Sequence, residues 1–84
     1  MTTKQLKKYE GKWVIIEWLD PQLHGGWQDK PENCEPLPSI SAGTLHFTQK
    51  GHIRLSGTLS TDQKHHADVT AYPVGCITKV LKCF

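Results

Sequence analysis

Glycine and proline residues divide this chain into short segments, and that division limits the fold more than any other feature. Five prolines and seven glycines are spread over 84 residues, and they are densest between Asp20 and Pro38. Proline fixes φ and has no N–H to donate to a strand ladder. The stretch 20–38 therefore predicts a long loop, and the remaining segments are too short for the long helices of a helical bundle.

Between these breaks, hydrophobic residues alternate with polar ones, which is the pattern of half-buried β-strands. Lys50-Gly51 predicts a hairpin turn between two such segments, because Gly51 can adopt a positive φ without strain. The predicted strands comprise residues 12–18, 39–49, 52–60, 67–72 and 76–81.

The first of these strands is hydrophobic on both faces, which is typical of a central or covered strand. Alternation places Val14, Ile16 and Trp18 on one face, and Trp13 and Ile15 on the other. This pattern therefore predicts that the strand lies inside the sheet rather than at its edge.

With a mass of 9.5 kDa, the chain has room for a single domain, residues 1–84. The basic N-terminal segment, residues 1–11, predicts one helical turn that Thr2 or Thr3 would cap and Gly11 would end. Five short strands without long helices predict an all-β fold, either a small five-stranded antiparallel SH3-like barrel or a curled sheet, with a long 20–38 loop.

The charge balance and the hydrophobic runs limit the cellular locations and the kinds of partner that we expect for this chain. Ten Lys and Arg against eight Asp and Glu give a net charge of +2, which is too mild to favour nucleic acid as a partner. The longest uncharged apolar run, residues 13–16, is far shorter than the roughly 20 residues that cross a bilayer. The N-terminus lacks the apolar core of a secretory signal. We therefore expect a cytoplasmic protein with no membrane partner.

The thiols and imidazoles show no spacing that predicts a metal site or a nucleophile. Cys34, Cys76 and Cys83 are odd in number and lack a Cys-x-x-Cys pair, so we expect reduced thiols. The adjacent His65 and His66 would point in opposite directions, and we interpret them as solvated loop residues. Neither a Gly-x-Ser-x-Gly elbow nor a Walker-type loop occurs. We expect no catalysis, no metal and no cofactor.

Two of the three tryptophans, Trp18 and Trp27, lie on either side of the pair Gly25-Gly26. They could help to close one end of a barrel, or they could form a slot in which a flat ring stacks, each stack contributing about 1–3 kcal/mol. A nucleotide in such a slot would also need polar groups for its phosphate and ribose. The candidate ligand-binding residues are Trp18, Asp20, His24, Trp27, Ser41, Arg54, His65 and Tyr72.

Several short motifs, taken in their order along the chain, resemble those of a known group of proteins. The series consists of Trp18-x-Asp20, Gly26-Trp27, Ser41-x-Gly43-x-Leu45 and Pro73-x-Gly75-Cys76-Ile77. The order of these motifs resembles that in a group of small, uncharacterised β-proteins encoded by tailed bacteriophages. The resemblance covers roughly residues 13–81. The chain departs from the group in having Tyr72 where an aliphatic residue is usual. The resemblance implies phage origin and a compact β fold, and it implies no particular activity.

A small phage protein without catalytic residues would act by binding. The first hypothesis is a sponge that sequesters a nucleotide-derived immune signal of the host, such as a cyclic nucleotide. Tight capture in the nanomolar range needs about 12 kcal/mol of binding free energy. So small a chain offers little concave surface, so we expect pockets between subunits and hence a homo-oligomer. The alternatives are an interaction module for a host protein or single-stranded nucleic acid, and a virion-associated structural protein.

Overall fold

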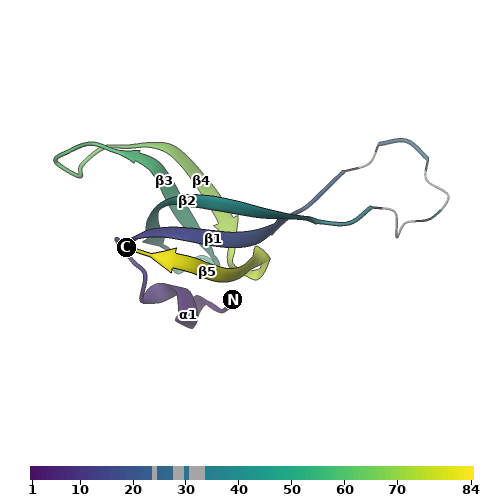
Figure 1. Cartoon of the computed structure of the whole chain (residues 1–84), viewed down its shortest axis with the longest axis horizontal. Helices are drawn as coiled ribbons and strands as arrows, with labels where there is room; N and C mark the ends of the chain where they lie inside the picture. The colour runs from purple at the N-terminus through teal and green to yellow at the C-terminus, as the bar shows by residue number, and fades with distance from the viewer. Residues whose placement is uncertain (24, 28–29, 31–33) are drawn as a thin grey trace.

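The computed structural model describes residues 1–23, 25–27, 30 and 34–84. A short helix precedes five strands, and a single 3-10 turn separates the last two strands (Figure 1). In chain order the elements are α1 (Thr3–Lys7), β1 (Trp13–Asp20), β2 (Leu37–Phe47), β3 (His52–Leu59), β4 (His66–Pro73), η2 (Val74–Cys76) and β5 (Ile77–Cys83).

All five strands belong to one antiparallel sheet in the order β4-β3-β2-β1-β5. This arrangement confirms the predicted all-β class and the five antiparallel strands. Strands β4 and β5 form the two edges, so the sheet is not closed into a barrel. The β3–β4 hairpin bends away from the plane of β1 and β5 (Figure 1). The open sheet therefore agrees with the curled-sheet alternative and not with the SH3-like barrel.

The hydrophobic core lies on one face of this sheet, and it is the face of β1 that carries Val14 and Ile16. Val14 and Ile16 are fully buried, whereas Trp13, on the other face of β1, is 41 % exposed. Leu6 of α1 is also fully buried against the sheet. The complete core comprises Leu6, Val14, Ile16, Leu45, Ile53, Leu55, Tyr72, Val74 and Ile77.

The N-terminal helical turn is fixed at both ends. Thr2 forms a capping box with Gln5, since the Thr2 hydroxyl accepts from the Gln5 N–H and the Gln5 side chain accepts from the Thr2 N–H. Gly11 has a φ of +76°, and its N–H donates to the carbonyl of Leu45 at 2.8 Å. The turn thereby leads the chain directly into β1. No helix within the described ranges is long and apolar enough to cross a membrane.

The described residues between 19 and 38 form an arm that projects from the body of the molecule (Figure 1). Pairing continues through Leu19↔Pro38 and Asp20↔Leu37, so the strands extend slightly into the predicted loop. Pro38 can occupy a strand here because β3 pairs with β2 only over Thr44–Phe47 and leaves this part of β2 with a free side. The arm therefore carries its loop away from the core.

Candidate functional site

Three of the predicted ligand-binding residues, Trp18, Ser41 and Tyr72, meet on the core face of the sheet. The indole N–H of Trp18 donates to the Ser41 hydroxyl oxygen at 2.9 Å. The Trp18 ring lies edge-on to Tyr72, with their centroids 4.9 Å apart. Tyr72 is buried, and Trp18 is half-buried against the core. The N–H of Trp18 and one side of its ring are thus engaged within the chain.

Trp27 lies apart from this group. Its side chain is 103 % exposed, and Leu23 nearby in the sequence is 92 % exposed. The predicted slot between Trp18 and Trp27 is not formed, because Trp18 packs on Tyr72 while Trp27 is fully solvent-exposed. No pocket is found among the described residues. A flat ligand could reach the exposed indole of Trp27, and the described residues provide no second wall beside it.

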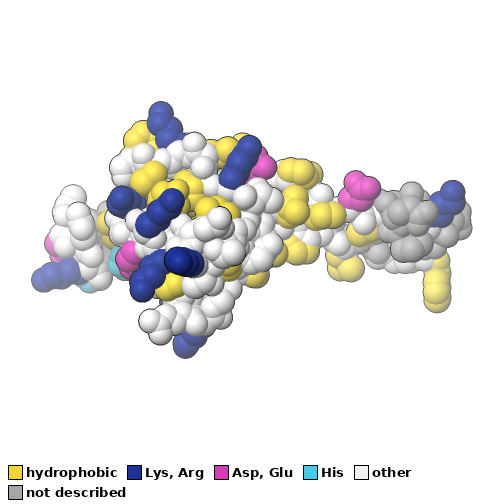
Figure 2. All heavy atoms as spheres, turned by 90° about the horizontal axis from the view of Figure 1, so that it is seen from below, with side chains coloured by type: hydrophobic (Ala, Val, Ile, Leu, Met, Phe, Trp, Pro, Cys, Tyr) yellow, Lys and Arg dark blue, Asp and Glu magenta, His cyan; other side chains and the backbone are white. Residues whose placement is uncertain are grey.

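Hydrophobic side chains continue along the arm and its base. Figure 2 shows them along the arm, next to the body of the molecule. Lys and Arg side chains gather on that body. Leu37 is 54 % exposed, and Ile40 of β2, at the base of the arm, is 66 % exposed. Sequence analysis missed Leu23, Leu37 and Ile40 as candidates, although Leu37 lies between two prolines in the predicted loop, which gave a signal. The described part of the arm and its base thus presents exposed apolar side chains.

The other predicted site residues are scattered. Arg54 lies on the opposite face of the sheet from Trp18, because it alternates with the buried Ile53 and Leu55 of β3. Asp20 is at the base of the arm, where it pairs with Leu37. His24 lies outside the described residues. The structure thus brings together Trp18, Ser41 and Tyr72, and it places Asp20, Trp27, Arg54 and His65 elsewhere.

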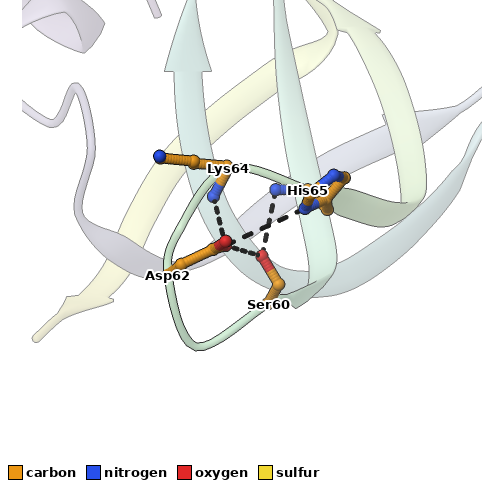
Figure 3. Close-up of polar contacts among 4 residues, drawn as sticks. All are labelled: Ser60, Asp62, Lys64 and His65. Carbon is orange, nitrogen blue, oxygen red and sulfur yellow. Dashed lines mark hydrogen bonds and ion pairs between the residues drawn. The ribbon is translucent and has the colours of Figure 1, made fainter.

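His65 belongs to a hydrogen-bonded loop between β3 and β4 (Figure 3). The Ser60 hydroxyl donates to the Asp62 carboxylate at 2.5 Å, and the Lys64 N–H donates to the same oxygen at 3.0 Å. These two bonds lower the pKa of Asp62, the Ser60 bond having the larger effect. The His65 N–H donates to the Ser60 hydroxyl oxygen at 3.0 Å. These contacts order the loop itself and leave the His65 imidazole exposed.

A cluster of two imidazoles around a buried hydroxyl was not foreseen from the sequence. His46 Nε2 lies 2.9 Å from Ser56 Oγ, and His66 Nδ1 lies 3.1 Å from the same oxygen. The two rings meet edge to face, with their centroids 4.5 Å apart. Ser56 is only 2 % exposed. His66 belongs to β4 and not to a solvated loop as interpreted, and only the pairing of β2, β3 and β4 brings these three residues together.

This cluster predicts that the free energy of unfolding depends on pH. Burial lowers the pKa of His46 from its ordinary value of 6.5, and the nearby charges of His66 and Arg54 lower it further, while Glu10 opposes them. As the pH falls, His46 therefore takes up a proton at a higher pH in the unfolded chain than in the folded chain. We expect full stability above pH 6.5 and a loss as the pH falls below that value.

Urea unfolding at pH 7.5, 6.5 and 5.5 tests this expectation. The unfolding midpoint of the wild type should fall with pH, and His46→Gln should flatten that dependence. His65→Gln serves as the control, because the His65 side chain is 81 % exposed, and it should keep the wild-type slope. An equally steep fall in His46→Gln would show that other groups cause it.

No group of three or more His, Cys, Asp or Glu side chains in the described part of the chain is placed to hold a metal ion. Comparison with protein family models, curated proteins and solved structures found no match to the chain. The resemblance to phage proteins and the expected ligand-binding function therefore stay predictions.

Proposed function

We propose that this chain is a non-catalytic interaction module that binds a partner protein through its arm. The free indole of Trp27 carries the proposal, with the exposed side chains of Leu23 and Leu37 beside it. Tryptophan is the residue type most enriched among binding hot spots, where it fills an apolar pocket of the partner. A small domain has few large side chains to leave in water, so an apolar arm favours a binding role over a structural one.

The charge of the arm favours a protein over a nucleic acid as the partner. Between residues 20 and 36 the sequence contains four acidic residues and one lysine, a net charge of −3. Phosphate groups would be repelled there. An apolar pocket bordered by Lys or Arg would instead complement both the indole and the charge. If the chain comes from a phage, as the resemblance implies, this partner would be a protein in the host cytoplasm.

Affinity capture with paired variants tests the proposal. The wild type and Trp13→Ala should retain the same host protein, whereas Trp27→Ala should lose it. The control also removes an exposed indole, but from β1 rather than from the arm. Because Trp27 contributes nothing to the core, Trp27→Ala should unfold at the wild-type temperature.

Two outcomes of this experiment would contradict the proposal. If Trp27→Ala captured the partner as well as the wild type does, the arm would not be part of the interface. Retention of single-stranded DNA by the wild type, with steep salt dependence, would indicate a nucleic-acid partner.

Capture of a nucleotide-derived signal is a second candidate, and the free indole of Trp27 also favours it. One chain offers a single stacking surface at Trp27, so a closed pocket would need a second subunit. Isothermal titration with a panel of cyclic nucleotides tests this function directly. Heat that Trp27→Ala abolishes would support it, and no heat with any member of the panel would end it.

A further inference from the structure

The sheet has two free edges of similar length. Strand β4 covers eight residues and pairs only with β3, and β5 covers seven residues and pairs only with β1. About half of the backbone N–H and C=O groups of an edge strand point away from its neighbour. Each edge is therefore a ready template for another strand.

The side chains of β4 do little to block such pairing. Seven of its eight residues are exposed, and Val69 is 47 % exposed. Asp68 is its only acidic side chain, and its carboxylate accepts from the Thr58 hydroxyl at 3.0 Å. Lysine, the residue that natural proteins place on edge strands against aggregation, is missing from β4.

The β5 edge differs in charge and complements the β4 edge. It carries Lys79 and Lys82, and Leu81 between them is 42 % exposed. Pairing of β5 with its own copy would bring like charges together. Pairing of β5 with β4 of a second copy would instead set lysines against Asp68 and leave both edges covered.

We propose that copies of this chain associate head to tail, with β4 of one copy paired to β5 of the next. Such a heterologous contact repeats, and it closes into a ring where the rotation between copies allows. The Met1 ammonium contacts the carbonyl of Ile77 at the start of β5. We therefore place the pairing with the next copy on the part of β5 that follows Ile77. The contact lies in the body of the molecule and does not involve the arm.

Two single variants, each blocking one edge, test the direction of the pairing. Val69→Lys sets a lysine of β4 against Lys79 and Lys82 of β5, and Leu81→Asp sets a carboxylate of β5 against Asp68 of β4. In sedimentation equilibrium the wild type should exceed the mass of one chain, 9.5 kDa, and each variant alone should sediment as a monomer. Trp27→Ala should keep the wild-type mass, so failure of this inference is distinguishable from failure of the proposed function.

Mixing the two variants provides the decisive measurement. Each still has the edge that the other lacks, so the mixture should form at least a dimer of one copy of each. The inference is overturned if the variants stay apart when mixed, if Leu81→Asp alone still associates, or if the wild type is monomeric throughout. Should a variant fail to fold, amide exchange of the wild type decides at those N–H groups of β4 and β5 that point away from β3 and β1: slow exchange of these groups on both strands supports the pairing, and fast exchange on either strand overturns it.

Discussion

Replacing Ile16 with alanine is expected to leave little folded protein at room temperature. Ile16 is fully buried at the centre of β1, with β2 on one side and β5 on the other. Its truncation would remove apolar contacts and leave a cavity, at a cost of about 2–5 kcal/mol. A single core in a domain this small supplies only about 3–5 kcal/mol in total.

Circular dichroism and thermal unfolding measure this loss. Ile40→Ala is the matched control, because it removes the same atoms from a side chain that is 66 % exposed. That control should change the free energy of unfolding by no more than about 0.5 kcal/mol. A cooperative transition of Ile16→Ala near the wild-type temperature would mean that the core relaxes around the cavity.

Replacing Gly43 with alanine should also destabilise the fold strongly, for the opposite reason. A Cβ at this position would lie 2.7 Å from the backbone oxygen of Ser56 and 3.2 Å from the Cβ of Leu55. These atoms belong to β3, so relief would require β2 and β3 to separate. Overpacking of this kind costs roughly 1–3 kcal/mol, and more where backbone must move.

Chemical denaturation of Gly43→Ala measures this cost. Gly75→Ala is the control, since a Cβ at Gly75 would meet nothing within 4 Å. We expect the unfolding midpoint to fall in the first variant and to stay within error in the second. Equal midpoints would show that the two strands can move apart at little cost. The close approach at Gly43 also gives a physical reason for the glycine of the Ser41-x-Gly43 motif.

Much of the fold could be predicted because its causes are local. Alternation in residues 12–18 correctly placed Val14 and Ile16 on one face and Trp13 on the other, but it did not show which face is the core, since both are hydrophobic. Gly51, with a φ of +84°, marked the hairpin turn. The open sheet could not be distinguished from a closed barrel, because closure depends on strand curvature and on register. The β1–β5 pairing, for example, shifts register between Ile15 and Ile16.

The candidate site was less predictable, because its residues are distant in the sequence. Trp18 and Trp27 look equivalent as flanks of one glycine pair. Only folding distinguishes them, since Tyr72, 54 positions beyond Trp18, packs against the Trp18 ring, whereas Trp27 stays exposed. The His46–Ser56–His66 cluster has the same origin in strand pairing.

The sequence by itself determined the strands, their turns and which residues of β1 share a face, because backbone preference and the two-residue period act over a few neighbouring residues. The tertiary structure decided which indole is packed, which hydroxyl lies between two imidazoles and which two strands remain as edges. Those outcomes depend on contacts between residues far apart in the chain, and short patterns do not encode them.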